Sequence, residues 1–527
     1  MPIHNNCLIH HFLETSAALY PDKVALIHEG TRATYAQINS KANRLAHWLL
    51  DQRVQAGDRI VLLLENSLEY VISYYGSLKT GAVVVPLSTD LKPDSLKPLL
   101  KELEPKIIVS SSKFERLLQA SDLDQFHIHG LLLNNSKLSW YSTNNVVHKW
   151  EQLIQAGNSS DPNQSIKENC LASIIYTSGS TAKPKGAMLS HKNIVSNTNA
   201  ICEYLHLTEN DIQMVVLPFF YVMGKSLLNT HIAVGGTVVL NNKFAFPAAV
   251  LKEMVQERVT AFSGVPSTYA YLLHRSPLSK YREKLQYLRY CTQAGGHMSH
   301  RIKEELRKIL PKHTKIYIMY GATEASARLT YLEPEQFQIK MDSIGRAIPG
   351  VSLQVLDSKG KEIPVGEVGE LVASGPNIMK GYWKDPEATA RVLDRNGYHT
   401  GDLCYKDSEG FFFIQGRRDT LLKVGGHRVN PQEIEDAILA SGLVIEAVVL
   451  GIPDNLLGYT LVAAATPKNG SCTETDILRS CARSLAKHKI PRSIQLLRAL
   501  PKSSSGKIDR NKCIRLISTM ADSILND

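Results

Sequence analysis

Short apolar runs alternate with segments of helical spacing through the first 180 residues, and this alternation constrains the fold more than any other feature of the sequence. The apolar runs lie at 59–64, 82–87, 106–109, 130–133 and 172–176. Residues 70–79, between the first two runs, have the apolar spacing of a helix, and residues 10–50 have the pattern helix, hairpin, helix. Strands separated by helices build parallel or mixed sheets, so the sequence predicts a large α/β domain of packed sheets.

The pattern changes further along the chain. From about residue 343 to 415, short strands and Gly/Pro turns predict a β-rich subdomain. The segment after it is expected to contain helices and strands at 431–440, 444–450, 460–466 and 474–487. We place the boundary near residue 417. This gives an N-terminal domain of residues 1–416 and a small, mobile α+β C-terminal domain of residues 417–527.

Composition excludes several classes of protein. With 43% hydrophobic and 21% charged residues among 527, the chain is globular and not disordered, collagen-like or coiled-coil. No apolar run reaches the roughly 18 residues that cross a membrane. Residues 1–14 lack the charged and then apolar pattern of a signal peptide. We therefore expect a cytoplasmic protein with no transmembrane segment.

Cysteine and histidine spacing gives no metal motif. The eight cysteines include no Cys-x-x-Cys pair and are expected to be reduced thiols, and no His-Glu-x-x-His occurs among the 18 histidines. The pairs His10-His11 and His127-His129 are expected to be surface or turn residues and not metal ligands.

The strongest chemical signal is an apolar strand that leads into a loop of glycine, hydroxyl and lysine residues. The sequence Thr-Ser-Gly-Ser-Thr-Ala-Lys-Pro-Lys-Gly follows the run 172–176 directly. Backbone N–H groups, hydroxyls and lysines in such a loop converge on one anion, as polyphosphate binding needs. The candidate ligands are Thr177, Ser178, Gly179, Ser180, Thr181 and Lys185.

The loop belongs to neither of the two common nucleotide-binding signatures. Gly224-Lys225-Ser226 has the closing tripeptide of a Walker A loop, but Phe219 stands where its first glycine is required. The dinucleotide fingerprint G-x-G-x-x-G is absent. The sequence therefore indicates a nucleotide enzyme outside both classes.

Further motifs follow in order along the chain. Thr323 and Glu324 come soon after the apolar run 315–319, and a hydroxyl beside a carboxylate suits phosphate and Mg²⁺. Asp402, in Thr-Gly-Asp, suits two ribose hydroxyls. The remaining motifs are Gly-Arg-Arg-Asp at 416–419, Lys-Val-Gly-Gly-His-Arg at 423–428 and Ser-Gly-Lys-Ile-Asp-Arg at 505–510.

In order and spacing, these motifs resemble the core motifs of the adenylate-forming superfamily, which includes acyl-CoA synthetases, peptide-synthetase adenylation domains and beetle luciferase. The resemblance extends from about residue 10 to 515. It implies an AMP-forming acid–thiol ligase that uses ATP and Mg²⁺ to convert a carboxylic acid to an acyl adenylate and then passes the acyl group to a thiol. Ala182 departs from the usual pattern, which has glycine there.

The resemblance also implies roles for individual residues. Loop 177–186 would hold the β and γ phosphates, Thr323 the α phosphate and Glu324 the Mg²⁺ ion, while Lys507 would be the catalytic lysine of adenylation. The adenine and ribose would be bound by Gly295, Tyr320, Gly321, Asp402 and Arg417. Asp419 would be the hinge between the two domains. After rotation of the small domain, Gly425 and Gly426 would line the thiol tunnel.

The acid pocket is expected between residues 217–226 and 261–273, with Tyr221, Val222 and Gly264 in its walls. Amino-acid-activating members of the superfamily place an aspartate in the first stretch. None stands between 212 and 241, so an α-amino acid is disfavoured. Burial gains roughly 0.8 kcal/mol per CH₂, which favours an apolar, fatty acid and a place in fatty acid metabolism. Tyr221 is either a gate for the acid or a core residue.

Two thiol acceptors remain open. Coenzyme A is favoured because the large domain shows no extra insertion of the kind that blocks CoA in fatty acyl-AMP ligases. The alternative is the phosphopantetheine arm of an acyl carrier protein. A luciferase-type oxidoreductase and a non-catalytic nucleotide binder are the other classes to consider, and the complete motif set, Lys507 included, argues against the second.

The net charge of +10 has one source. Residues 479–515 contain eleven Lys and Arg against a single acid, Asp509, and the rest of the chain is balanced. No aromatic residues interleave this run, so nucleic acid is disfavoured as a partner. The basic field around Lys507 is expected to serve the triphosphate and to attract CoA phosphates or an acidic carrier protein.

Overall fold

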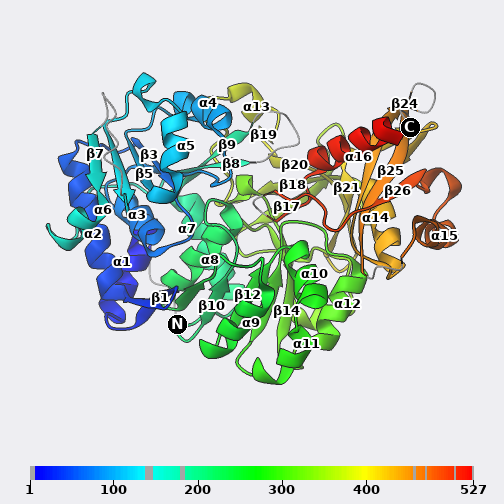
Figure 1. Cartoon of the computed structure of the whole chain (residues 1–527), viewed down its shortest axis with the longest axis horizontal. Helices are drawn as coiled ribbons and strands as arrows, with labels where there is room; N and C mark the ends of the chain where they lie inside the picture. Colours follow the sequence, from blue (N-terminus) through cyan, green and yellow to red (C-terminus); the bar gives the residue numbers. More distant parts are fainter. Residues whose placement is uncertain are drawn as a thin grey trace.

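Two large sheets with helices packed between and around them form the N-terminal part of the molecule (Figure 1). The computed structural model describes residues 6–136, 146–177, 184–454, 458–468, 472–503 and 506–524, with the backbone alone for Asp419 and 518–524. The expected α/β class, with a β-rich subdomain and a small C-terminal domain, is confirmed. No helix in these ranges is long and apolar enough to cross a bilayer.

The first sheet contains, within the described residues, seven strands in the order β7-β6-β5-β3-β4-β8-β9. In chain order they are β3 (Arg59–Leu63), β4 (Val83–Pro86), β5 (Ile107–Ser111), β6 (Gly130–Asn134), β7 (Val146–Lys149), β8 (Leu171–Thr177) and β9 (Lys185–Ser190). All neighbours are parallel except β8 and β9, which form an antiparallel pair on either side of the glycine- and hydroxyl-rich loop.

The second sheet has the order β16-β15-β14-β13-β12-β10-β11-β1-β2. Its strands are β1 (Val24–His28), β2 (Thr31–Thr34), β10 (Ile212–Val215), β11 (Thr237–Leu240), β12 (Ala261–Gly264), β13 (Tyr290–Gln293), β14 (Lys315–Tyr320), β15 (Thr330–Leu332) and β16 (Arg346–Ala347). The central strands β10, β12, β13 and β14 run parallel. Their carboxyl ends therefore meet at one edge of the sheet, where open α/β sheets bind ligands.

Helices α1, α3, α7 and α8 contact one another between the two sheets. Their bounds, with those of the other helices of the large domain, are α1 (Ile9–Leu19), α2 (Tyr35–Asp51), α3 (Leu68–Lys79), α4 (Pro93–Leu103), α5 (Glu115–Ala120), α6 (Trp150–Gln155), α7 (His191–Tyr204), α8 (Val222–Ala233), α9 (Pro247–Gln256), α10 (Pro266–Arg275), α11 (Leu278–Tyr281), α12 (His300–Ile309) and α13 (Pro386–Ala390). Local sequence fixes several starts: α7 begins at a capping box in which Ser190 and Asn193 satisfy each other's backbone N–H groups.

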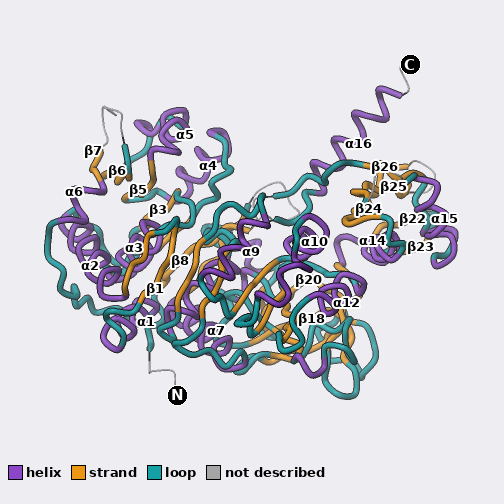
Figure 2. The backbone as a smooth tube through the Cα atoms, turned by 60° about the horizontal axis from the view of Figure 1, so that its bottom comes forward, coloured by secondary structure: helices purple, strands orange, loops and turns teal. Residues whose placement is uncertain are grey.

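The β-rich subdomain and the C-terminal domain each have a smaller sheet. The subdomain strands are β17 (Ser352–Leu356), β18 (Gly369–Ser374), β19 (Leu393–Asp394), β20 (Gly397–Lys406) and β21 (Phe412–Arg417). The C-terminal elements are β22 (Leu422–Val424), β23 (His427–Val429), α14 (Pro431–Ala440), β24 (Val444–Asp454), β25 (Gly458–Pro467), α15 (Glu474–Ser484), β26 (Ser493–Leu496) and α16 (Arg510–Ile524). Figures 1 and 2 show the C-terminal elements beside α10, α12 and β20.

The expected helix 431–440 coincides with α14 because the residues next to its start determine where it begins. Asn430 caps the helix through the N–H of Gln432, and Pro431 occupies the first turn, where its missing N–H costs nothing. The chain changes from the subdomain sheet to the C-terminal sheet between Arg417 and Leu422, across the short 3₁₀ helix η6 (Arg418–Thr420).

One expectation about histidine is wrong. His10 is not a surface or turn residue: it lies in α1 and is only 6% exposed. The helix buries its apolar side fully, with Ile9, Phe12 and Leu13 at 0% exposure, and this packing takes His10 inward with it. His127 and His129 are exposed, as expected.

Candidate active site

A cavity of about 220 Å³ lies where the carboxyl ends of strands from both large sheets approach the C-terminal domain. Its walls come from the segments that follow β8, β10, β12, β13 and β14, and from Arg417 and Lys507. Segments far apart in the sequence therefore face one space because parallel strands end on the same side. Of the expected site residues, the structure brings to this cavity Thr177, Tyr221, Val222, Gly295, Gly321, Thr323, Glu324, Arg417 and Lys507.

Gly321 shows why its segment can pass so close to the chain behind it. A Cβ added there would lie 2.0 Å from the carbonyl oxygen of Ala327, a distance that no side chain tolerates. Gly295 has φ of +82°, and a Cβ on it would stand 3.6 Å from Cε of Lys507. Gly321 thus permits two backbone segments to pack closely, and Gly295 keeps the space beside Lys507 free of a side chain.

A buried carboxylate, Asp402, lies behind the cavity residue Arg417. Asp402, 5% exposed, accepts a hydrogen bond from the hydroxyl of Tyr320 and another, at 2.9 Å, from Nε of Arg417. Burial and the Asp402 carboxylate raise the pKa of Tyr320 well above its usual value, so the phenol stays a donor. Burial lowers the pKa of Arg417, but Asp402 outweighs it and the net shift is upward.

Glu324 is held by a partner that sequence reasoning missed. The carboxylate follows β14 in the short 3₁₀ helix η4 (Thr323–Ala325), and its Oε1 accepts a 2.7 Å hydrogen bond from the hydroxyl of Tyr382. Burial and Glu324 raise the pKa of Tyr382. Glu324 lines the cavity, and among the described residues no hydrogen bond reaches its Oε2, so this oxygen remains for a cation.

The described part of the phosphate loop consists of its two ends. Thr177 ends β8 and pairs in register with Lys185, the first residue of β9. The ammonium of Lys185 lies 5.2 Å from the centre of the Tyr382 ring, so this lysine and the Glu324 carboxylate share one aromatic neighbour. The expected ligands Ser178, Gly179, Ser180 and Thr181 lie outside the described residues.

Lys507 reaches the cavity from the C-terminal domain. Two hydrogen bonds hold its backbone: the N–H of Ser503 donates to the carbonyl oxygen of Lys507 at 2.8 Å, and Ser267 Oγ donates to the carbonyl of the preceding Gly506 at 2.6 Å. The side chain is open to solvent within the cavity, yet protein surrounds it closely enough to lower its pKa. Desolvation is the main cause, Arg417 adds to it and Glu324 opposes it.

The apolar wall agrees only in part with the expected acid pocket. Leu217, Tyr221, Val222 and Val265 line the cavity, and Tyr221 is half-buried there. Gly264 does not line the cavity. It ends β12, and a Cβ on it would come within 2.8 Å of Cγ2 of Thr268, so close packing explains the glycine.

The two glycines expected at the thiol tunnel do not line the cavity in this arrangement of the domains. Gly425 and Gly426 form the exposed turn between β22 and β23, with φ of +54° and +86°. Two left-handed residues in a two-residue hairpin require glycine or asparagine, so the turn itself accounts for them. Their role after rotation stays a prediction, as does the hinge at Asp419, whose backbone lies in η6.

Tyr382 and Arg328 are the site residues that the sequence did not reveal. Arg328, 3% exposed, lines the cavity beside the Glu324 segment. Tyr382 follows Gly381, whose φ of +133° marks a sharp change of direction. A glycine followed by two aromatic residues, Tyr382-Trp383, was the available signal, but nothing in it connects Tyr382 with a carboxylate 58 positions away.

Comparison with known proteins identifies the family. Residues 13–383 match the AMP-binding enzymes, and residues 433–507 match the C-terminal domain of AMP-binding enzymes. The chain belongs to this family, the adenylate-forming superfamily. The relatives below are named CoA ligases or synthetases, so the expected enzyme class of AMP-forming acid–thiol ligases is confirmed.

Relatives with these names align over nearly the whole chain. A long-chain-fatty-acid–CoA ligase of Bacillus subtilis is 30% identical over 544 residues, which cover 98% of this chain and 95% of the relative. A 2-succinylbenzoate–CoA ligase of Bacillus cereus is also 30% identical, over 97% of this chain and 98% of its own length.

Solved structures of a CoA synthetase and of MatB also match nearly the whole chain. ATP-bound MatB from Rhodopseudomonas palustris superimposes with a TM-score of 0.83 at 27% identity, over 96% of this chain and 98% of that one. The o-succinylbenzoate CoA synthetase MenE from Bacillus subtilis, in complex with its acyl-adenylate intermediate, has a TM-score of 0.81 at 27% identity, over 95% and 97%.

Proposed function

We propose that this enzyme converts an apolar carboxylic acid of the fatty class to its acyl adenylate with ATP and then transfers the acyl group to coenzyme A. The observation that carries the proposal is one cavity lined by two chemically different sets of residues. Thr323, Glu324, Arg417 and Lys507 supply charge and hydroxyl groups, and the segment 217–224 supplies mainly apolar side chains.

Adenylation needs charge compensation because a carboxylate must approach an α phosphate that is itself an anion. The hydroxyl of Thr323 would contact that phosphate, and the ammonium of Lys507 would offset the charge that develops along the reaction path. Asp402, fixed by Tyr320 and Arg417, would accept the ribose hydroxyls. Lys185 would contribute to binding of the β and γ phosphates.

The residues present also fit a Mg²⁺ ion. A single oriented carboxylate beside a phosphate site is the donor set that Mg²⁺ commonly takes, with phosphate oxygens and water completing its shell. Glu324 would hold the ion, and Tyr382 would keep that carboxylate oriented. When bound, the ion supplies neutralisation of the triphosphate charge.

The apolar class of acid rests on the wall formed by Leu217, Tyr221, Val222 and Val265. None of these side chains offers a cation to a second carboxylate. The named relatives act on different acids, from long-chain fatty acids to succinylbenzoate, so relationship alone does not choose among them.

Two half-reactions on one site require the small domain to move, and we place the boundary between residues 1–416 and 417–527. In the arrangement seen here Lys507 occupies the cavity, which suits adenylation. Release of Lys507 and rotation about the region of Asp419 would open the site to a thiol.

ATP–pyrophosphate exchange with a panel of fatty, aromatic and dicarboxylic acids tests the first half of the proposal. We expect the fastest exchange with a fatty acid, and exchange with no acid would contradict a ligase. Thioester formation with free CoA, compared with a phosphopantetheinylated acyl carrier protein, tests the second half. If the carrier protein is loaded and no CoA thioester forms, the acceptor is the carrier protein and not CoA.

A further inference from the structure

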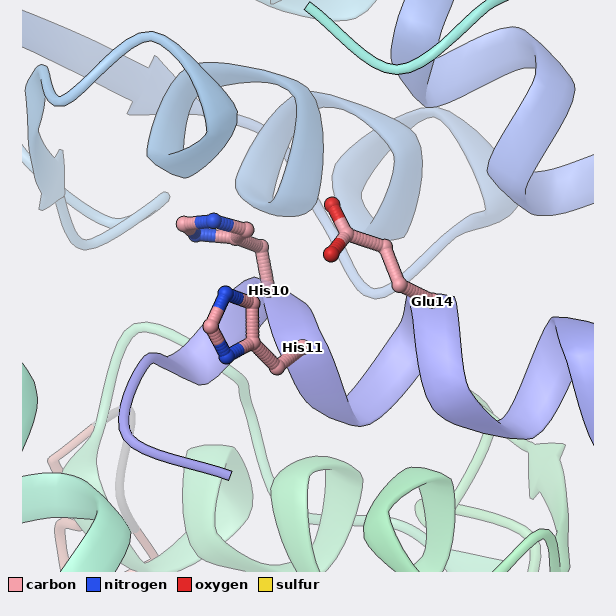
Figure 3. Close-up of side chains that lie close together, drawn as sticks. All are labelled: His10, His11 and Glu14. Atoms are coloured by element: carbon pink, nitrogen blue, oxygen red, sulfur yellow. The ribbon is translucent and has the colours of Figure 1, made fainter. Parts of the chain in front are cut away.

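Three potential metal ligands gather at the start of α1, far from the candidate active site in the sequence. His10, His11 and Glu14 each offer one ligand atom, and these atoms all lie within 4.8 Å of one another. Figure 3 shows the two imidazole rings next to each other and the Glu14 carboxylate one turn further along the helix. The spacing i, i+1, i+4 brings them together because positions four apart share one face of a helix.

The burial of His10 makes the cluster unusual. At 6% exposure, its Nδ1 is buried and has no hydrogen-bond partner among the described residues. A buried polar atom without a partner is costly, so it calls for an explanation. The ring of His11, with its centroid 4.9 Å from that of His10 and at 82° to it, has no hydrogen bond within the described part of the chain either.

A third histidine nearby does not supply the missing partner. Nδ1 of His191 accepts the backbone N–H of Ile9 at 3.2 Å, so a neutral His191 carries its proton on Nε2. A protonated nitrogen cannot bind a metal, and His191 is therefore a neighbour of the cluster and not a ligand. The hydrogen bond from Ile9 joins α1 to α7, because His191 is the first residue of α7.

Glu14 is oriented by a buried lysine. Lys79, on α3, donates to Oε1 of Glu14 and, at 2.7 Å, to Asp161, and its side chain is fully buried. No hydrogen bond reaches Oε2 of Glu14 among the described residues. Carboxylate ligands of metals are commonly fixed by such outer hydrogen bonds, which leave the other oxygen for the ion.

We propose that His10, His11 and Glu14 form a binding site for one divalent transition-metal ion of the zinc type. Two imidazoles and one carboxylate are a donor set typical of Zn²⁺ and Co²⁺, whereas Mg²⁺ prefers oxygen ligands only. Three protein ligands leave room for water in the remaining position. The site is separate from the Glu324 carboxylate.

The expected role of the ion is structural. Helix α1 contacts α3, α7 and α8, and Ser16 of α1 donates to the carbonyl of Ile232 at the end of α8. Helix α8 begins in the wall of the active-site cavity at Val222. An ion held by α1 would thus stabilise the helical layer behind that wall and take no part in the chemistry.

Cobalt titration of the tag-free, metal-stripped full chain tests the site directly, because Co²⁺ bound to nitrogen ligands absorbs visible light. We expect one equivalent of Co²⁺ to produce the absorption and Zn²⁺ to displace it. His11→Ala is the main variant because His11 is only half-buried. The matched control is the exposed pair, His127→Ala/His129→Ala.

His11→Ala should weaken cobalt binding by more than the roughly 10–100-fold that loss of an outer partner costs, and the control should bind normally. Zn²⁺ should raise the thermal unfolding midpoint of the wild type and of the control but not that of His11→Ala, which is measured alongside to show that the variant folds. Equal cobalt absorption in His11→Ala, or none in the wild type with excess Co²⁺, would overturn the site. If His11→Ala does not fold, His10→Gln replaces it, and unchanged absorption there would overturn the site equally. None of these readouts depends on ligase activity.

Discussion

The two halves of the active site are positioned in different ways. In the large domain, Asp402 and Glu324 are each fixed by a tyrosine hydroxyl from the same domain. Lys507 owes its place to contacts across the domain boundary. The two carboxylates proposed for ribose and Mg²⁺ are therefore positioned mainly by the large domain, whereas the lysine proposed for adenylation depends on how the two domains sit together.

Both polar and apolar contacts cross the boundary. Besides the bond between Ser267 and Gly506, the ammonium of Lys502 lies 3.7 Å from the centre of the Tyr271 ring, and His297 lies 3.0 Å from Asp436. The boundary also has a cavity lined by apolar residues of both domains. A partly exposed ion pair such as that of His297 contributes little stability. Domains joined by a limited interface commonly move relative to each other, so we propose that Lys507 can leave the site while the carboxylates of the large domain keep their partners.

The largest effect is expected from removing the side chain of Lys507, which the C-terminal domain brings to the cavity. Lys507→Ala should lower the rate of acyl-adenylate formation by about 10²–10³-fold, because a preorganised charge is lost. Thioester formation from supplied acyl adenylate should remain near the wild-type rate. Lys512→Ala, an exposed lysine of the same domain, is the control. Equal loss of both half-reactions would contradict the division of the site.

The next largest effect is expected from a change at Asp402, in the part of the site that the large domain positions. Asp402→Asn removes a charge that binds Arg417 and Tyr320, and hydrogen bonds to charged groups contribute about 1.5–3 kcal/mol. The KM for ATP, measured in the pyrophosphate exchange assay, should therefore rise roughly 10–100-fold. An unchanged KM for ATP would show that Asp402 does not organise the nucleotide.

The pH dependence of adenylation reports on Lys507. Its pKa is lowered, so the ammonium charge is present below that pKa and is lost as pH rises through it. We expect kcat/KM for adenylation to fall about tenfold per pH unit on an alkaline limb that lies below the usual range of a lysine. Lys507→Arg should move this limb to higher pH, since arginine stays charged. A limb that does not move would assign the titration to another group.

The smallest effect is expected from Tyr382→Phe. The variant removes one hydrogen bond to Glu324, a contribution of about 0.5–1.5 kcal/mol, or roughly 2–10-fold in the Mg²⁺-dependent rate. The Mg²⁺ concentration for half-maximal activity should rise by the same factor. Tyr405→Phe, whose ring stacks on Phe413 in the subdomain, is the control. A change as large as that of Lys507→Ala would mean that Tyr382 contacts the substrate itself.

The sequence was most informative where local chemistry decides the structure. The start of α14 follows from Asn430 and Pro431, and the apolar runs that end in chemical motifs correspond to β8 and β14. That the motifs meet in one site was implied by the resemblance alone, and the structure shows that the parallel central strands bring several of them to one edge.

Contacts between segments that are distant in the sequence could not be predicted from the sequence. Tyr382 and Glu324 are 58 positions apart, and Tyr320 and Asp402 are 82 apart, so no periodicity connects them. The prediction that His10 is a surface or turn residue was wrong for a related reason. Its burial depends on the helices that pack against α1, and the pair His10-His11 does not reveal that packing. Gly264 lies outside the lining of this cavity, and its close contact with Thr268 shows that a glycine can serve packing as well as open space.

Locking the two domains together tests the central claim most directly. His297 and Asp436 face each other across the boundary and are partly exposed, so both can be replaced by cysteine and joined by a short thiol crosslinker, in a background where the exposed Cys7 and Cys170 are serine. The locked enzyme should form acyl adenylate at the rate of the uncrosslinked protein and should transfer almost none of it to CoA. Thioester formation at the uncrosslinked rate while the domains are locked would contradict the account.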